Sequence, residues 1–160
     1  MIVPLIITAA GMFFFYSQLG LTHTFTGLIL AHTALGTPFV VITVTATLTG
    51  FDTNLIRASQ SLGADTFRTF FKVIMPLILP GVISGALFAF ITSFDEVVVV
   101  LFIGSIEQIT IPKQMWAGLR QETSPVILSM ATCLVLLSIA LLTTVELLRR
   151  RSERLRGINR

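Results

Sequence analysis

Residues 28–49 read LILAHTALGTPFVVITVTATLT and contain no Asp, Glu, Lys or Arg. A helix needs about 20 predominantly apolar residues to cross the hydrocarbon core of a bilayer. Lipid offers backbone groups no hydrogen-bond partner, so such a segment must satisfy them internally, as an α-helix does. Further apolar runs cover about residues 2–17, 74–94 and 126–148. The sequence therefore predicts an all-α, polytopic membrane protein, with one transmembrane domain over residues 1–160 and four spans.

The composition excludes a soluble domain. Of the 160 residues, 54% are hydrophobic and 12% are charged, which is too apolar for a water-facing coat. The net charge of +3 does not indicate a nucleic-acid partner, because the basic residues flank the apolar runs and do not form one face. Cys133 is the only cysteine, so a disulfide framework or a cysteine metal site is excluded. We expect no catalytic site, no metal site, and membrane lipid as a partner.

The basic residues predict the orientation of the chain in the membrane. Arg57, Arg68 and Lys72 lie between the second and third runs, and six arginines follow the fourth run. Only Lys113 and Arg120 lie between the third and fourth runs. Loops rich in Lys and Arg stay in the cytoplasm. We therefore expect a cytoplasmic loop over about residues 50–73, and amino and carboxyl termini that are both cytoplasmic.

This loop and the start of the next run, residues 51–80, read FDTNLIRASQSLGADTFRTFFKVIMPLILP. Asp52 or Asn54 is suited to cap a first short helix, and Asp65 or Thr66 a second. A loop with its own helices is more than a simple connector. Two interpretations follow from the pattern: the loop docks on another protein, or it lies on the lipid headgroups with its phenylalanines in the membrane.

The same loop resembles the EAA loop of ABC importer permeases, in which Glu-Ala-Ala is followed by a spaced Gly and a later Leu-Pro. The positions that carry the resemblance are Arg57, Ala58, Ser59, Leu62, Gly63, Ala64, Phe70 and Pro76. Two of them depart from the motif. Arg57 stands where Glu is expected, and Ser59 replaces the second Ala, so a role that depends on the family's carboxylate does not transfer.

The resemblance implies a type I ABC importer permease in the bacterial inner membrane. Its coupling helices, here about Arg57 to Gly63, would sit in a cleft of a cytoplasmic ATPase subunit. The chain contains no G-x-x-x-x-G-K-[ST] loop to cradle phosphates. We therefore expect a transport subunit and not an enzyme, with ATP and Mg bound by the partner ATPase and no cofactor bound by this chain. A second permease subunit and a solute-binding protein complete the expected assembly.

Asp95 and Glu96 follow the third run directly and precede a valine-rich stretch, Val97 to Ile103. That stretch either extends the third span or forms a separate short element that dips back. Ionisable groups at membrane depth are costly, which makes them functional candidates. As one interpretation, the two carboxylates attract a cationic solute on the translocation path. As the other, they mark the outer end of a helix at the headgroups.

Longer stretches are similar to permeases of the spermidine and putrescine branch: residues 27–33, GLILAHT, residues 93–99, SFDEVVV, residues 111–116, IPKQMW, and residues 118–122, GLRQE. This resemblance implies a polyamine cargo, for which Trp116 would add cation–π attraction to the charge of Asp95 and Glu96. Family members usually have six spans. By that comparison the first two are expected to be missing here, through a truncated gene model or because the chain is a fragment.

Two alternatives to polyamine import remain at the level of sequence. The first is an ABC permease for another small solute. The second is an ion-coupled secondary carrier of a small cationic solute, with Asp95, Glu96 and His32 as coupling groups. A lone histidine in a helix bundle is more often hydrogen-bonded to a neighbouring backbone than engaged in a proton relay.

Overall fold

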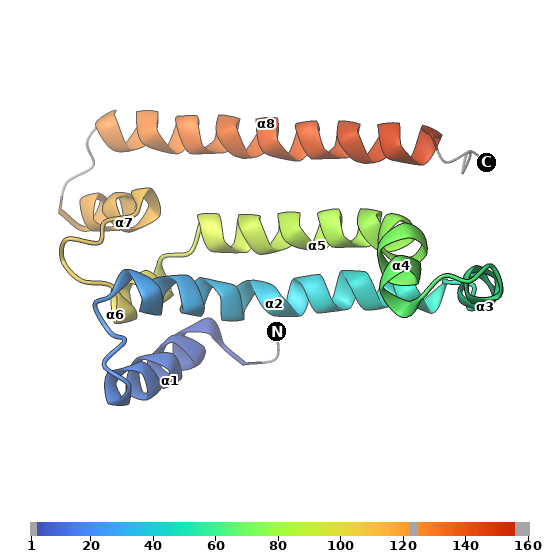
Figure 1. The fold of residues 1–160 in the computed structure, drawn as a ribbon. Coiled ribbons are helices and arrows are strands. Elements are labelled where there is room, and N and C mark those ends of the chain that lie inside the picture. The colour runs from blue at the N-terminus through green and yellow to red at the C-terminus, as the bar shows by residue number, and fades with distance from the viewer. Residues whose placement is uncertain (1–2, 122–124, 156–160) are drawn as a thin grey trace.

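The computed structural model describes residues 3–121 and 125–155, and these residues form helices joined by short connections (Figure 1). Three helices are long and apolar enough to cross a membrane: Phe25–Thr49, Thr66–Phe94 and Pro125–Thr144. No strand occurs within the described ranges. The elements are α1 Leu5–Gln18, α2 Phe25–Thr49, α3 Asn54–Ser61, α4 Thr66–Thr69, the π-helix η1 Phe70–Ile74, α5 Met75–Phe94, α6 Val98–Ile103, α7 Ile111–Gln121 and α8 Pro125–Leu155.

The pair α2 and α5 forms the centre of the fold, and small residues bring the two backbones together. A Cβ atom at Gly81 would collide with Thr47 Oγ1, and one at Gly85 would lie 2.8 Å from Val40 Cα. The threonines at this contact turn their hydroxyls back on their own helix: Thr47 Oγ1 donates to Thr43 O at 2.9 Å. The glycines of α5 let the two helices approach closely, and the threonine hydroxyls of α2 are hydrogen-bonded within their own helix. The helices therefore pack closely without leaving a polar group unpaired.

A second contact joins α1, α2 and α6 at one end of the long helices. Its buried side chains are those of Ala9, Tyr16, Leu28, Ala31, Leu35, Val99, Val100 and Ile103. The valine-rich stretch is thus a separate short helix, the second of the two forms expected from the sequence. The N–H of His23 donates to Ile103 O at 2.8 Å and fixes the α1–α2 connection to the end of α6.

The first expected span, residues 2–17, is represented by a helix shorter than a membrane crossing. Helix α1 has 14 residues, which rise about 21 Å against a hydrocarbon core of about 30 Å. It begins at Leu5 because Pro4, which has no N–H group, precedes it and accepts hydrogen bonds from Ile7 N and Thr8 N at 3.0 and 3.2 Å. The structure therefore has three helices of membrane length and one shorter apolar helix within the described residues.

The third span begins earlier than expected. Helix α4, η1 and α5 follow one another without a break, so the second helix of the loop runs directly into the span. Pro76 explains the π-helix: its ring conflicts with the carbonyl of residue 72 in a regular α-helix, and a wider turn relieves that conflict. The loop's second helix is therefore the first part of the membrane helix.

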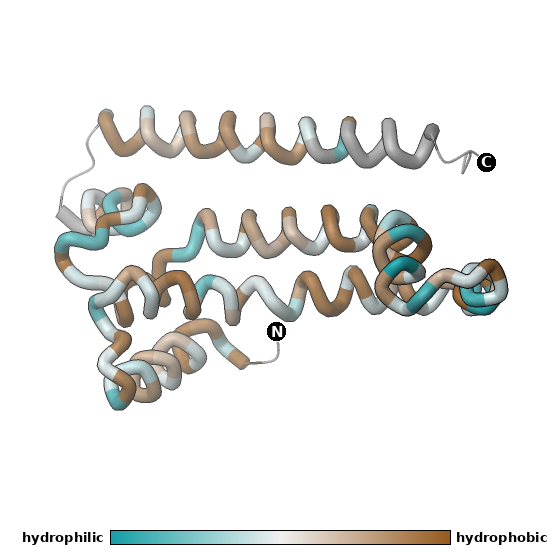
Figure 2. The backbone as a smooth tube through the Cα atoms, in the orientation of Figure 1, coloured by the Kyte–Doolittle hydropathy of each residue, from teal (hydrophilic) through white to brown (hydrophobic). Residues whose placement is uncertain are grey.

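The two ends of the molecule differ in their elements. Helices α3 and α4 and the carboxyl end of α8 lie at one end of the long axis, and α6 and α7 lie at the other (Figure 1). Hydrophilic residues gather at α3, α4 and α7, whereas α2, α5 and the described part of α8 are mostly apolar along their length (Figure 2). Helix α8 lies outside α5 and α7, and many of its apolar side chains are exposed. This distribution matches a protein whose middle faces lipid or other membrane helices.

Candidate functional site

The segment over residues 54–69, which we call the coupling segment, consists of α3, a tight turn and α4. Gly63 adopts a φ of +80°, which a side chain disfavours. This turn lets Ala64 N donate to Ser59 O at 3.1 Å. Asp65 Oδ1 then accepts a hydrogen bond from Arg68 N at 2.7 Å. Of the two residues expected to cap the second helix, Asp65 and Thr66, it is therefore Asp65 that caps α4.

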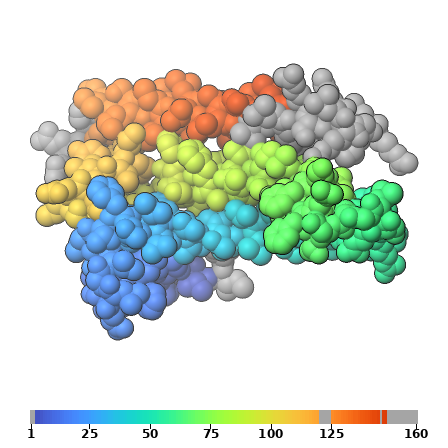
Figure 3. Space-filling model, in the orientation of Figure 1, coloured from blue at the N-terminus to red at the C-terminus, as the bar shows by residue number. Residues whose placement is uncertain are grey.

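A side-chain bond ties the two helices of the coupling segment together. The hydroxyls of Ser59 and Thr69 lie 3.0 Å apart, and Thr69 is buried. Ser59 is one of the two positions that depart from the EAA motif, and alanine there could not form this bond. The hydroxyl tie, the Gly63 turn and the Asp65 cap together make the segment a compact unit at the end of the bundle (Figure 3).

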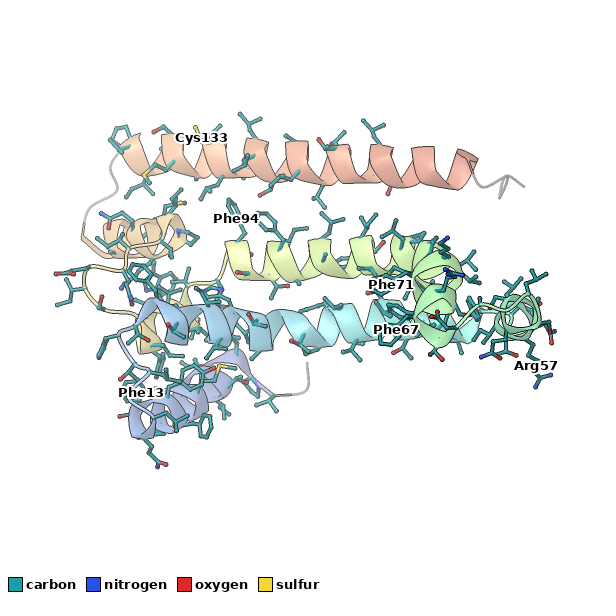
Figure 4. All side chains as sticks on the ribbon, viewed as in Figure 1. Phe13, Arg57, Phe67, Phe71, Phe94 and Cys133 are labelled. Carbon is teal, nitrogen blue, oxygen red and sulfur yellow. The ribbon has the colours of Figure 1, made fainter. Side chains whose placement is uncertain are left out.

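The outer surface of the coupling segment carries uncovered apolar side chains among its hydrophilic residues. Leu62 is 89% exposed and Phe67 is 77% exposed. Arg57 points away from the helical bundle, and Phe67 and Phe71 lie where α4 meets the long helices (Figure 4). Exposed aromatic and aliphatic side chains beside a charged residue are typical of a surface that binds a partner or a membrane.

The residues predicted from the motif fall into two groups. Residues 57–64 form α3 and its turn, where Arg57 and Ala58 are exposed and Ser59 and Ala64 are half-buried. Phe70 lies in η1, and Pro76 lies in the first turn of α5. The second group therefore belongs to the base of the membrane helix and not to the protruding turn.

The structure separates the two neighbouring carboxylates. Glu96 is buried, and its Oε1 accepts a hydrogen bond from Val99 N at 2.9 Å, so it caps α6. Asp95 is exposed and lines a cavity of about 310 Å³ together with Phe94, Pro112 and residues of α8. Phe94 points from the end of α5 toward α8 (Figure 4). The two side chains therefore do not form one joint carboxylate site.

Trp116 lies on α7 and is partly exposed. The described lining of the cavity that contains Asp95 does not include it. Helix α7 reaches that cavity through Pro112. The three residues expected on the translocation path thus have different surroundings: Asp95 is exposed and lines a cavity, Glu96 is buried, and Trp116 is exposed on α7.

His32 gains a partner that the sequence did not predict. Its Nδ1 lies 2.9 Å from Ser93 Oγ, a side chain on α5, whereas a backbone partner was the favoured interpretation. Two cavities, of about 660 and 320 Å³, are both lined by His32, Ser93 and Thr110. This polar pair therefore joins α2 to α5 between two hollows at the α7 end of the bundle.

A set of bonds fixes the connection over residues 104–110, which forms one side of the larger cavity. Lys113 Nζ donates to Ser105 O at 2.7 Å and to Gln108 O at 3.1 Å. Gln108 is buried, and its Oε1 accepts from Ser105 N at 2.9 Å. The bonds of Lys113 to backbone carbonyls leave no pattern in the local sequence and could not be predicted from it.

Comparison with known proteins adds family relationships to this geometry. The chain is 32% identical over 153 residues to the spermidine/putrescine transport system permease protein PotC of Haemophilus influenzae, covering 96% of this chain and 60% of that protein. It is 32% identical over 150 residues to PotC of Escherichia coli K12, covering 94% of this chain and 57% of the relative. It is also 35% identical over 131 residues to the molybdenum transport system permease protein ModB of E. coli K12, covering 79% and 56% of the two chains.

The chain thus spans less than two thirds of the length of these relatives. A family model described as the binding-protein-dependent transport system inner membrane component matches residues 1–154. That match covers nearly the whole chain, including the coupling segment and all three helices of membrane length. The chain belongs to the family of binding-protein-dependent transport system inner membrane components.

Proposed function

We propose that this chain is a membrane-spanning permease subunit of an ATP-driven importer of polyamines. The observation that carries the proposal is the coupling segment, a compact unit with exposed apolar side chains that is directly continuous with a membrane helix. The exposed side chains of Leu62 and Phe67, together with Phe71 in the adjoining η1, need a protein or lipid neighbour. Its partner in this proposal is the cleft of an ATPase subunit, which holds ATP and Mg.

The continuity of α4, η1 and α5 supports a mechanical role for the segment. When the ATPase subunits close on ATP, a push on α3 is passed to α4 through the Ser59–Thr69 bond. It then reaches α5 without crossing a flexible linker. The close contact of Gly81 with Thr47 carries the movement to α2. Rocking of this helix pair against a second permease subunit would open the path alternately to each side.

The charge of the cavity linings favours a cationic cargo more strongly than the sequence identity to any one relative does. The relatives include permeases named for spermidine and putrescine and one named for molybdenum, at similar identities. The described linings of the cavities at the α7 end contain Asp95 and Glu107 but neither Lys nor Arg. An acidic lining attracts cations and repels anions. Polyamine cargo, delivered by a binding protein, fits this lining.

The orientation expected from the basic residues is part of the proposal. The coupling segment and the carboxyl end of α8 lie at the same end of the molecule (Figure 1). Both carry the basic residues that favour the cytoplasm. The cavities with His32 and Asp95 would then lie toward the outer face of the inner membrane.

The test is substitution of Gly63 by leucine in the intact transport complex. A leucine at a φ of +80° strains the turn, so α3 should lose its position, ATPase co-purification should fall sharply, and ATP-driven polyamine uptake should be lost. Gly50→Leu is the matched control, because Gly50 has a φ of −91° and its nearest neighbour to a new Cβ lies 4.0 Å away. Both variants should insert into the membrane normally.

Two results would count against the proposal. One is undiminished ATPase recruitment by Gly63→Leu. The other is wild-type polyamine uptake into proteoliposomes that an ion gradient drives without any ATPase, which would favour a secondary carrier. Vanadate-sensitive uptake that needs ATP and a loaded binding protein would support the importer.

A further inference from the structure

The larger cavity, of about 660 Å³, lies at the opposite end of α2 from the coupling segment. Its walls are mainly apolar and include Phe25, Leu28 and Ile29. Its polar side chains come from three separate parts of the chain: α2, the end of α5 and the connection over residues 107–110. Apolar walls with a small number of convergent polar groups are typical of small-molecule sites.

His32 provides one of these polar groups. Its Nδ1 is engaged by Ser93 Oγ, and among the described residues no hydrogen bond to its Nε2 occurs. When Nδ1 carries the proton and donates to Ser93, Nε2 has a free lone pair and accepts hydrogen bonds. An ammonium group in the cavity, which can only donate, would select this tautomer.

Glu107 provides the charge. It lies in the connection whose shape Lys113 fixes through bonds to Ser105 O and Gln108 O. The Lys113 ammonium is thereby directed to backbone oxygens and is not among the residues that line the cavity. Glu107 is then the only charged lining residue in the described part of this cavity. The Phe25 ring, exposed and on the same lining, offers a face that attracts cations.

We propose that this cavity binds a primary ammonium group of an alkylamine cargo, with Glu107 as counter-ion, His32 Nε2 as hydrogen-bond acceptor and Phe25 as cation–π contact. Ser93 is a positioning residue that orients the imidazole. The apolar wall of Leu28 and Ile29 receives the methylene chain. This inference deepens the proposed function and rests on it, because it assigns a cargo-binding station to the end of the bundle away from the ATPase.

The experiment uses the intact transport complex in proteoliposomes, with putrescine as the probe delivered by a saturating amount of its binding protein. Glu107→Gln removes the charge at constant shape, and His32→Ala removes the acceptor. Each should lower the ATP-driven uptake rate about tenfold, as expected for loss of a hydrogen bond to a charged group. Glu107→Asp keeps the charge and should show a higher uptake rate than Glu107→Gln. His32→Gln is a second variant at position 32, and it keeps a polar group facing Ser93.

Thr37→Val is the matched control, since it removes a polar group from the same helix outside this cavity, where the hydroxyl donates to Thr33 O at 2.7 Å. Its uptake rate should equal that of the wild type. Co-purification of the ATPase with each variant checks assembly. Full uptake by both Glu107→Gln and His32→Ala would overturn the site and leave the proposed importer standing. Wild-type complexes that hydrolyse ATP with a loaded binding protein but never accumulate putrescine would overturn the proposed polyamine function itself.

Discussion

Substitution of Gly81 by alanine tests the contact between α2 and α5 on which the proposed transmission of movement depends. A Cβ at this position would collide with Thr47 Oγ1, would lie 2.9 Å from Thr47 Cβ and would lie 3.0 Å from Thr43 O. A backbone oxygen inside a helix cannot turn away as a flexible side chain can. The two helices must therefore move apart to accept a single methyl group.

The size of the effect follows from two opposing terms. Overpacking of a tight contact costs about 1–3 kcal/mol, and replacing glycine by alanine within a helix returns about 0.5–1 kcal/mol. The difference between the central values of these two ranges is a destabilisation of roughly 1 kcal/mol. Gly11, in α1, is the matched control because a Cβ there meets no heavy atom within 4 Å. Gly11→Ala therefore gains the helix stability that alanine provides, without any cost of overpacking.

The assay is thermal unfolding of the purified transport complex in detergent. The measured quantity is the fraction of complex that remains assembled after heating to each temperature. Gly81→Ala should lower the midpoint, and Gly11→Ala should leave it unchanged or raise it. Adding Thr47→Ala to Gly81→Ala removes the colliding oxygen and should recover part of the loss. Equal midpoints for the two single variants would refute the close contact between α2 and α5.

Two further substitutions test the bonds near the two ends of the molecule. Ser59→Ala removes the partner of the buried Thr69 hydroxyl, and the loss of this hydrogen bond costs about 1 kcal/mol. Amide hydrogen exchange in residues 59–69 should therefore accelerate about fivefold. Unchanged exchange would show that the Ser59–Thr69 bond contributes nothing to stability. Glu96→Ala removes the cap of α6 at a cost of about 1 kcal/mol, and it should reduce the yield of assembled complex. Glu96→Gln keeps an oxygen that can accept the hydrogen bond, so its yield should equal that of the wild type. Equal yields from the two variants would contradict the capping role.

Local sequence patterns predicted the features of this fold that depend on near neighbours. The lengths of the apolar runs predicted both ends of α2 and α5 and the start of α8 within a few residues, because the bilayer sets the length of a crossing helix. The end of α8, at Leu155, lies beyond the apolar run. The cap at Asp65 was also predictable, since an aspartate before a helical run bonds a backbone N–H three residues later. The positive φ of Gly63 gives a physical reason for a glycine at that position of the motif.

The features that depend on distant neighbours were not predictable in the same way. His32 and Ser93 are separated by 61 positions, so their bond follows only from the register of α2 against α5. Glu96 looked like half of an acidic pair with Asp95. A sharp turn after α5 sends the two side chains into different surroundings. The continuation of α4 into α5 was missed because Pro76 signals a helix boundary in sequence, whereas a π-helix absorbs it here.

The placement of the two proposed sites on one helix links them physically. Helix α5 has 20 residues, which rise about 30 Å, and it is continuous with the coupling segment at one end and carries Ser93 near the other. Ser93 is bonded to His32, which lines both cavities at that end. A small tilt of a stiff helix moves its two ends in opposite directions. In the proposed importer, a displacement of α4 by the ATPase would therefore change the spacing between α5 and the connection over residues 107–110. The cavity would loosen or tighten around its ammonium group without any contact between cargo and nucleotide.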